Sequence, residues 1–405
     1  MIAGYKTAVL KFGGTSLSTQ EDREIAAARV ADASRDGLRP VVVCSAIGRR
    51  PDPYATDTLD GLVAAADARN RDALLACGEI IAAALFAEVL CAKGFSANAL
   101  SGAQAGIVTN DNFGDAQIVE VNPARIQKML ERNVVPVVAG FQGVTRAGEV
   151  TTLGRGGSDL SAVALAHALG ASELDIFTDV NGVFSADPDR VCGAHPLERA
   201  HLQEMSELAE NGARIMHAKA AEYARETGTA YAVKGLRTGV GTIIDDCVNH
   251  ERPVTGVTST TGLTFLRIIR GEVEDRKARM QVELAMFKRF AQHHISIDLI
   301  NINAAGVFFV VGSHHVDTIR RLLADLNLAV RVRSECAKLS IIGAGMRGAS
   351  GVIYRVVQAL SDANVEIIHS TDSHITISVL VPQSEVSRAE QAIHEYFQLG
   401  RGAPA

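Results

Sequence analysis

The sequence has little that would suit a nucleic acid or a membrane. Its net charge is −6 and its basic residues are scattered among acids, so no surface for a phosphate backbone is expected. The most apolar stretch, residues 80–92, contains Glu88 and follows Glu79, and is too short and too charged for a membrane span. We expect a buried helix there. No secretory signal opens the chain, so we expect a cytoplasmic protein without nucleic-acid or membrane partners.

Cysteine is also sparse, and its spacing excludes a disulfide framework. The six cysteines occur singly, with no CxxC pair and no grouping with histidine. The histidine doublets at 293–294 and 314–315 lack ligand spacing as well, so we expect no metal site built by the protein alone. Reduced, mostly buried thiols are expected, as in an ordinary cytosolic enzyme.

An apolar content of 47% over 405 residues is enough for two or three globular domains. Up to about residue 245, apolar strands alternate with amphipathic helices, for example AVLKFGG, RPVVVCSA, VVPVVAGFQG and ELDIFTDV. This alternation predicts an α/β domain over residues 1–250, with a mainly parallel sheet covered by helices on both faces. In such a sheet, ligands bind at the carboxyl ends of the strands.

The pattern changes after the polar stretch at 245–253. Two strand–helix–strand–strand–helix units follow, which predict two ferredoxin-like domains over residues 251–333 and 334–405. The second contains GAGMRG at 343–348, which matches a dinucleotide fingerprint. No acidic residue ends a following strand in a long βαβ unit, so we favour a glycine-rich turn there instead.

Three glycine-bearing segments carry the functional signal: VLKFGGTSL at 9–17, TTLGRGGSDLSA at 151–162 and FTDVNGVFSADP at 177–188. Each brings glycine, hydroxyl groups and charge together next to a strand or turn. Bare backbone amides in such loops hold phosphate oxygens. Together the segments indicate a protein that binds a phosphate donor and a small anionic acceptor.

The first segment has the groups needed for phosphoryl transfer, which depends on positioning and on positive charge. Lys11 would direct a cation at the phosphates, Gly13 and Gly14 would let the backbone approach, and Thr15 and Ser16 would add hydroxyl donors. The alternative is a plain strand-to-helix turn with a surface lysine.

The second segment suits an acidic acceptor. Arg155 stands between glycines, where a guanidinium fork can grip a carboxylate, although an ordinary surface ion pair is the alternative. Ser158 would lie at or near the N-terminus of the next helix and offer its hydroxyl, as N-cap residues do. Asp159 would orient the lysine or the substrate amine, or only favour the helix dipole.

In this order and over essentially the whole chain, the three segments resemble those of aspartate kinases, which belong to the amino-acid kinase family and carry a regulatory pair of ACT domains. The segments SAIGRRPDPYATDTL at 45–59 and SGAQAGIVTND at 101–111 are similar to the diaminopimelate-pathway branch. The resemblance implies phosphorylation of the side-chain carboxylate of L-aspartate by ATP with Mg²⁺, the first step toward lysine, threonine and methionine. It also implies feedback by an amino-acid effector and a homodimer or larger assembly through the ACT domains.

The resemblance implies roles for individual residues as well. Lys11 and Asp159 would be catalytic, and Ser45, Glu79, Arg155 and Ser158 would bind aspartate, with Glu79 receiving its ammonium group. The residues implied for ATP are Lys11, Gly13, Gly14, Thr15, Ser16, Thr178, Asp179, Phe184, Asp187, Arg190 and Arg214.

Several of these positions depart from the family pattern near the nucleotide. Phe184 stands for a tyrosine, the DPR triplet becomes Asp-Pro-Asp-Arg with Arg190 displaced by one residue, and Arg214 replaces a lysine. Arginine keeps the charge of lysine but changes the geometry. Two alternatives therefore stay open: a catalytically weakened effector-sensing subunit, and a kinase for a related acidic amino acid.

The regulatory part offers polar groups at strand ends, where such domains hold an effector. These are Asp298, Asn301, Ser370, Thr371 and Asp372. Solvated turn residues are an equally good interpretation. The loop RGEVEDRKARMQ lacks the proline–glycine turn common in lysine- or threonine-sensing members, so the sequence names no effector.

Overall fold

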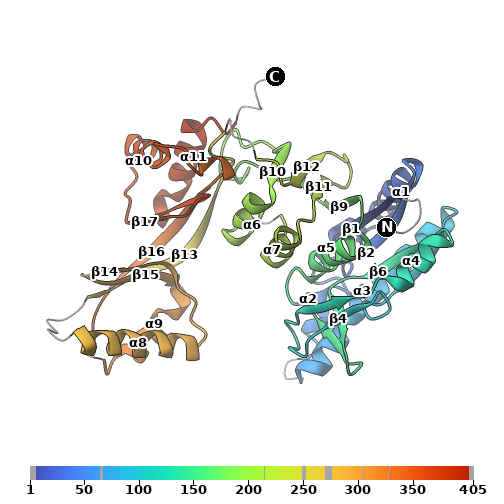
Figure 1. Cartoon of the computed structure of the whole chain (residues 1–405), viewed down its shortest axis with the longest axis horizontal. Coiled ribbons are helices and arrows are strands. Elements are labelled where there is room, and N and C mark those ends of the chain that lie inside the picture. The colour runs from blue at the N-terminus through green and yellow to red at the C-terminus, as the bar shows by residue number, and fades with distance from the viewer. Residues whose placement is uncertain are drawn as a thin grey trace. The chain divides into compact units, whose positions relative to one another are not determined.

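The computed structural model describes residues 6–63, 67–213, 215–248, 252–269, 276–303, 305–326 and 328–400. Contacts divide the chain into two compact units (Figure 1). The first unit consists of Met1–Phe184 and Pro196–Val248, and the second of Ser185–His195 and Asn249–Ala405. The short segment of the second unit therefore interrupts the first in sequence.

The first unit is built on an eight-stranded sheet in the order β10-β12-β11-β9-β1-β2-β6-β3. All its pairings are parallel except that of β11 with β12, which confirms the predicted α/β fold. Its strands are β1 (Lys6–Phe12), β2 (Leu38–Cys44), β3 (Ser96–Leu100), β6 (Val134–Ala139), β9 (Glu173–Thr178), β10 (Arg199–His201), β11 (Tyr231–Gly235) and β12 (Gly241–Asp245). β1 and β2 are buried along most of their length, as central parallel strands require.

In the described residues of the first unit, seven helices accompany these strands. They are α1 (Gln20–Arg35), α2 (Thr56–Asp60), α3 (Ala68–Ala92), α4 (Ala124–Glu131), α5 (Gly157–Leu169), α6 (Leu202–Glu210) and α7 (Ala218–Thr227). Within the described residues, α3 alone has the length and composition to cross a membrane, and half of its most apolar window is buried in the protein. It packs on β3 and β6, as predicted for a buried helix, although it is longer than the predicted stretch.

A second, four-stranded sheet in the first unit was not predicted. Its order is β5-β4-β7-β8, from strands β4 (Ile107–Thr109), β5 (Ile118–Val121), β7 (Gln142–Thr145) and β8 (Val150–Thr152). Strands of three or four residues leave almost no alternation to detect in a sequence. Buried Asp72 of α3 ties this sheet to the main layer, because its carboxylate accepts hydrogen bonds from the backbone of Gly114 and from both the backbone and the hydroxyl of Thr152.

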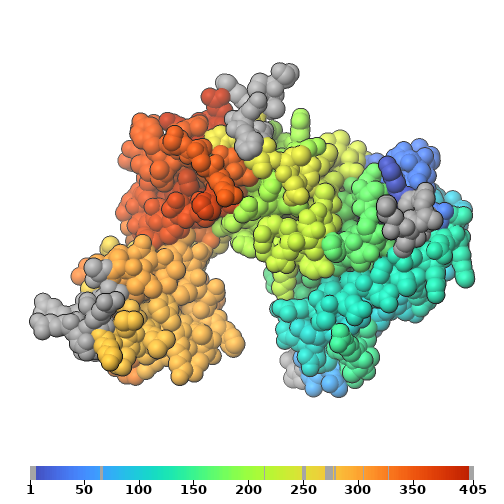
Figure 2. Space-filling view, viewed as in Figure 1, coloured from blue at the N-terminus to red at the C-terminus, as the bar shows by residue number. Residues whose placement is uncertain are grey.

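The second unit has one continuous six-stranded antiparallel sheet, in the order β14-β15-β13-β16-β18-β17. It confirms two strand–helix–strand–strand–helix repeats, with strands β13 (Gly256–Ile269), β14 (Asp298–Asn303), β15 (Gly306–Gly312), β16 (Ala329–Ile342), β17 (His369–Asp372) and β18 (Thr376–Pro382). The helices are α8 (Arg276–Gln292), α9 (Val316–Leu323), α10 (Val352–Asp362) and α11 (Val386–Tyr396). In Figure 2 the two repeats form separate lobes of this unit.

The two repeats share their longest strands. The first half of β13 pairs with the second half of β16, and the two strands pair again beyond the register shifts at residues 260–265. Val254 and Val257 accordingly belong to the core of the second repeat. The first repeat is thus inserted within the second, whereas the sequence predicted two consecutive domains that meet at residue 333. Since β16 is antiparallel to both neighbours, GAGMRG lies in no parallel βαβ unit.

All six cysteines are free, as predicted, but only Cys44 and Cys336 are buried. The expectation of mostly buried thiols was wrong. Cys77 and Cys91 lie on the exposed side of α3, where the apolar composition of the helix had suggested complete burial.

Candidate active site

Three glycine- or hydroxyl-bearing segments meet at the carboxyl ends of the central strands. In the sheet register, Phe12 of β1 lies opposite Cys44 of β2 and Phe177 of β9. The residues that follow, Gly13, Ser45 and Thr178, therefore emerge at the same edge. The sheet brings together segments that lie far apart in the sequence.

The segment after β1 approaches the segment after β2 very closely. A Cβ atom on Gly14 would lie 2.4 Å from the Ala46 carbonyl oxygen, so only glycine fits there. The Gly48 amide donates to the Gly14 carbonyl at 3.1 Å. Thr15 and Ser16 then begin a 3-10 turn, Thr15–Leu17, which places both hydroxyls at this edge.

Lys11 forms an ion pair with Asp159 at the start of α5. The distance from Nζ to the carboxylate is 2.6 Å, and the side chains are only 11% and 13% exposed. A pair this well shielded from water interacts more strongly than a surface pair. The prediction that Asp159 orients the lysine agrees with this contact, and the lysine is not the free surface residue of the alternative interpretation.

The N-terminus of α5 is shaped by glycine. Gly156 is the N-cap residue with φ of 73°, and a Cβ there would lie 2.0 Å from Cβ of His217. Ser158 is the second residue of the helix, two residues after the cap, and is buried close to Gly140, which follows β6. Ser158 therefore lies near the N-terminus of α5, as predicted, although Gly156 and not Ser158 is the N-cap residue. Arg155, just before the cap, is exposed.

His217 also lies at the N-terminus of α5, although no role was predicted for it. Its pKa is lowered by burial and by the charge of Lys219, with smaller effects from Asp159 and Arg155. The 2.0 Å approach of a Gly156 Cβ to Cβ of His217 places this residue directly beside the N-terminus of α5. His217 also caps α7, because its Nδ1 accepts from the Lys219 amide at 3.4 Å.

Glu79 is the most perturbed acid of the site. It is 2% exposed on α3; its Oε1 accepts from the Ala46 amide at 3.1 Å, and its Oε2 has no hydrogen-bond partner. Burial raises its pKa to about 8. Burial raises the pKa of the Cys44 thiol, and nearby Glu79 adds to this shift while nearby Lys11 opposes it. Lys11 lies opposite Val43 in the sheet, one residue before Cys44. A buried, unpartnered carboxylate oxygen is suited to receive a ligand cation.

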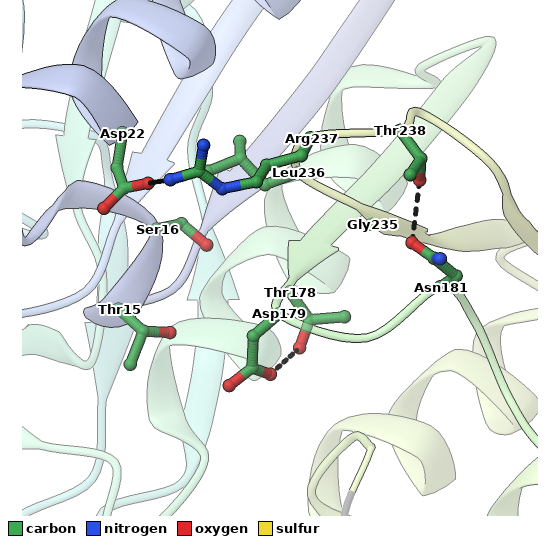
Figure 3. Close-up of a pocket in the computed structure, with 10 residues that line it drawn as sticks. All are labelled: Thr15, Ser16, Asp22, Thr178, Asp179, Asn181, Gly235, Leu236, Arg237 and Thr238. Atoms are coloured by element: carbon green, nitrogen blue, oxygen red, sulfur yellow. Dashed lines mark hydrogen bonds and ion pairs between the residues drawn. The ribbon is translucent and has the colours of Figure 1, made fainter.

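A cavity of about 310 Å³ lies beside the β1 and β9 segments (Figure 3). Arg237 on its rim is held by Asp22 at 2.8 Å and by Glu21 at 2.6 Å, while Asn181 accepts from the Thr238 hydroxyl at 2.7 Å. We call it the Thr178 cavity, and its lining residues are Thr15, Ser16, Asp22, Thr178, Asp179, Asn181, Gly235, Leu236, Arg237 and Thr238.

The cavity contains only part of the predicted nucleotide set. Thr15, Ser16, Thr178 and Asp179 line it, with Gly13 and Gly14 in the adjoining segment. Phe184 instead forms a bridge with Pro196, and Arg214 lies outside the described residues. Gly235, Leu236, Arg237 and Thr238 also line the cavity, so the end of β11 and the loop after it contribute to the site, which no motif had indicated.

Asp187 and Arg190 belong to the second unit. The Arg190 guanidinium pairs with Glu390 at 3.2 Å and donates to the Ser259 hydroxyl at 2.8 Å. Its role as a nucleotide ligand stays a prediction, and one that this contact argues against, because the guanidinium already has partners. Asp187 accepts from the Asp189 amide at 3.0 Å.

The predicted effector residues lie on the two edge strands of the six-stranded sheet. Asp298 on β14 pairs with the buried Lys338, and its other oxygen accepts from the Leu299 amide at 2.8 Å. Asn301 follows on the same strand, and Ser370, Thr371 and Asp372 lie on β17. His369 joins the strands through a hydrogen bond to the Leu299 backbone and a ring contact with Phe265 at 5.3 Å.

The fold, with its glycine- and hydroxyl-bearing segments at one edge of the sheet, is that of an amino acid kinase, and comparison with known proteins agrees. The amino acid kinase family model matches residues 6–234, and an ACT domain model matches residues 331–395. Aspartokinase 1 of Bacillus subtilis is 38% identical over 98% of this chain and 100% of its own length.

Solved structures extend the likeness to the whole fold. E. coli aspartokinase III with aspartate and ADP (R-state) is 25% identical, with a TM-score of 0.77 over 96% of this chain and 99% of that one. The same enzyme with lysine and aspartate (T-state) gives a TM-score of 0.74 over the same shares. The chain belongs to the aspartokinases, phosphotransferases with a carboxyl group as acceptor and regulation by amino acids through ACT domains.

Proposed function

We propose that this protein transfers the γ-phosphoryl group of ATP to the side-chain carboxylate of L-aspartate, with Mg²⁺, and yields 4-phospho-L-aspartate and ADP. The related E. coli enzyme has been crystallised with aspartate and ADP, which supports these substrates. The observation that carries the proposal is the meeting, at one edge of the sheet, of the Lys11–Asp159 pair with a buried, unpartnered carboxylate oxygen on Glu79.

The donor binds in the Thr178 cavity in this proposal. Backbone amides of Gly13 and Gly14 and the hydroxyls of Thr15 and Ser16 hold phosphate oxygens. Asp179 is exposed on the cavity wall and fits one carboxylate ligand of a nucleotide-bound Mg²⁺, which usually takes one or two protein carboxylates besides phosphates. When bound, the ion neutralises charge on the phosphates.

The acceptor is gripped at its two ends. Arg155 binds the α-carboxylate through its fork, and Glu79 receives the ammonium group, with Ser45 and Ser158 alongside. The side-chain carboxylate then attacks the γ-phosphorus in line, and the bond to the β–γ bridging oxygen breaks. Lys11, kept in place by Asp159, stabilises the negative charge on the transferring oxygens.

A comparison of acceptors tests the proposal. Aspartate, glutamate and N-acetylglutamate are offered with MgATP, and the acyl phosphate is trapped as its hydroxamate. We expect turnover with aspartate and none with N-acetylglutamate, since an acylated amine would leave the Glu79 carboxylate buried without a cation. Glutamate keeps the ammonium group and tests whether the site also accepts a side chain that is one methylene longer. Product from N-acetylglutamate at a similar rate would contradict the assignment of Glu79 and favour a kinase for a related acid.

One observation favours a second candidate, a weakened effector-sensing subunit. Asp189 stands where the family has an arginine, and Arg190 is engaged by Glu390. Calorimetry with ATP, with and without Mg²⁺, separates the two candidates. Binding with Mg²⁺ supports the kinase, whereas no heat of binding at millimolar ATP would favour the weakened subunit.

The Michaelis constant for aspartate should fall as pH rises toward 8. The pKa of Glu79 is raised to about 8 by burial, so the free enzyme carries a protonated Glu79 at lower pH and must lose that proton to pair with the ammonium group. We expect up to a tenfold decrease per pH unit between about pH 6 and 8, and then a plateau. Initial rates at varied aspartate and saturating MgATP measure it.

Two variants of the same helix control this experiment. Glu79→Gln should raise the Michaelis constant for aspartate and make that constant independent of pH. Glu88→Gln, at an exposed position of α3, should behave as wild type. A slope that persists in Glu79→Gln would assign the titration to another group.

The effector, the assembly and the pathway are also part of the proposal. An amino acid would bind at the strand edges that carry Asp298, Asn301, Ser370, Thr371 and Asp372, and ACT domains would join subunits into a homodimer or larger assembly. The product would enter the diaminopimelate route to lysine, threonine and methionine. Thermal shifts with these three amino acids and with diaminopimelate identify the effector, because a ligand that prefers the native state raises Tm.

A further inference from the structure

Residues 183–197 form a hairpin whose base belongs to the first compact unit and whose tip, Ser185–His195, belongs to the second. Its two legs are paired. The Leu197 amide donates to the Val183 carbonyl at 2.7 Å, and the Ser185 amide donates to the His195 carbonyl at 3.0 Å. The chain therefore passes from one unit to the other and back as a paired ribbon rather than as two independent strands.

The base of the hairpin is fastened to the wall of the Thr178 cavity. Asn181 lines the cavity, and Gly182 packs so tightly that a Cβ would lie 2.6 Å from the Thr242 hydroxyl. That buried hydroxyl accepts from the Val183 amide at 2.8 Å and donates to the Leu197 carbonyl at 2.6 Å. One side chain of β12 thus holds both legs of the hairpin beside the cavity.

The tip is fastened to α11 in the second ACT repeat. Ser185 Oγ lies 3.0 Å from Nε2 of His394, and both residues are buried. Cys192 exchanges two hydrogen bonds with the Gln391 side chain, at 2.8 and 3.2 Å. Ala186 and Val191 are part of the hydrophobic core that α11 helps to form. The tip is therefore integrated into the fold of the regulatory unit.

A further attachment of the tip is the ion pair of Arg190 with Glu390. Glu390 is 1% exposed, and the arginine nitrogen lies 3.2 Å from its carboxylate. Burial raises the pKa of this carboxyl, while Ser259 and Arg190 oppose that shift. Removing either partner leaves the other charge buried without a counter-charge, and this lowers the free energy of unfolding. The arginine displaced by one position in the sequence thus has a partner outside the nucleotide site.

We infer that Glu390 and His394 of the second ACT repeat are positioning residues for the loop at residues 178–182, acting through the hairpin 183–197. A change in α11 alters the hairpin tip, and the paired legs pass the change to Thr242 and Asn181. The inference rests on the proposed role of the Thr178 cavity as the ATP site. It assigns Arg190 to this connection rather than to the nucleotide.

Kinetics of four variants of the full chain test the inference. Glu390→Gln removes the charge but keeps the shape of the side chain, and Arg190→Ala removes its partner. Each should raise the Michaelis constant for ATP about fivefold to tenfold and change that for aspartate less than twofold. The double variant should be no worse than the more impaired single variant, since both changes break one contact. Ile319→Val, in the core of the other repeat, is the control for a general loss of stability.

Three outcomes would overturn the inference. In the first, Arg190→Ala raises the Michaelis constant for ATP and Glu390→Gln does not, which would indicate that Arg190 binds the nucleotide directly. In the second, neither variant differs from wild type. In the third, the constants for both substrates change together, as expected for the Ile319→Val control if stability alone matters.

Failure of the proposed function would look different. Wild-type protein would then form no hydroxamate from aspartate and MgATP. Calorimetric titration of the same variants with ADP measures nucleotide binding in the absence of turnover. Weaker ADP binding in Glu390→Gln than in Ile319→Val supports the inference whatever the acceptor proves to be, and equal binding in the two variants contradicts it.

Discussion

Replacing Lys11 by alanine should reduce kcat on the order of a thousandfold and change the Michaelis constant for aspartate less than threefold. Charge gathers on the transferring phosphoryl oxygens in the transition state, and a cation positioned there in a partly dehydrated site contributes mainly to that state. Aspartate is held elsewhere in our proposal, by Arg155 and Glu79. Hydroxamate trapping at saturating MgATP gives both constants.

The lysine variant needs controls for charge and for folding. Lys6→Ala removes a cation from the same strand at an exposed position and should retain wild-type kcat. Lys11→Arg keeps the charge but changes its geometry, and should recover only part of the rate. Because alanine leaves the Asp159 carboxylate without its partner at 2.6 Å, thermal melting is measured alongside. A folded Lys11→Ala protein within tenfold of wild-type kcat would contradict the role of Lys11.

The parts of the fold that sequence could predict are those encoded by local pattern. The strands that end at Phe12, Cys44 and Thr178 are continuous apolar runs, and glycine or hydroxyl residues follow each of them. In a parallel sheet such ends meet at one edge, so the clustering of the first and third segments followed directly. The buried Lys11–Asp159 pair agrees with the role predicted for Asp159.

What sequence could not predict depends on pairing between distant residues. Nothing in the composition of residues 256–260 shows that they pair with residues 338–342, although this pairing inserts one ACT repeat into the other. Arg190 carries no sign that its partner is Glu390, two hundred residues away. His217 escaped notice because its neighbours are set by the packing of α5 against α7.

Replacing Arg155 by alanine should raise the Michaelis constant for aspartate on the order of a hundredfold, with a smaller effect on kcat. A bidentate guanidinium–carboxylate contact is among the stronger charge-assisted hydrogen bonds, and losing about 3 kcal/mol weakens binding about 150-fold. In the free protein Arg155 is exposed just before the N-cap of α5, so its removal should hardly affect stability. Initial rates at varied aspartate, with thermal melting, measure both effects.

The substrate whose Michaelis constant changes in Arg155→Ala distinguishes aspartate binding by Arg155 from two alternatives, a surface charge and a phosphate ligand. If Arg155 served only as a surface charge, Arg155→Ala would bind aspartate as wild type does. If Arg155 contacted the phosphates, the Michaelis constant for ATP would rise instead. Arg155→Lys keeps one charge without the fork and should fall between wild type and alanine. A variant with a raised constant for aspartate alone therefore places the acceptor carboxylate at the N-terminus of α5, on the same edge of the sheet as the lysine that stabilises the transferring phosphate.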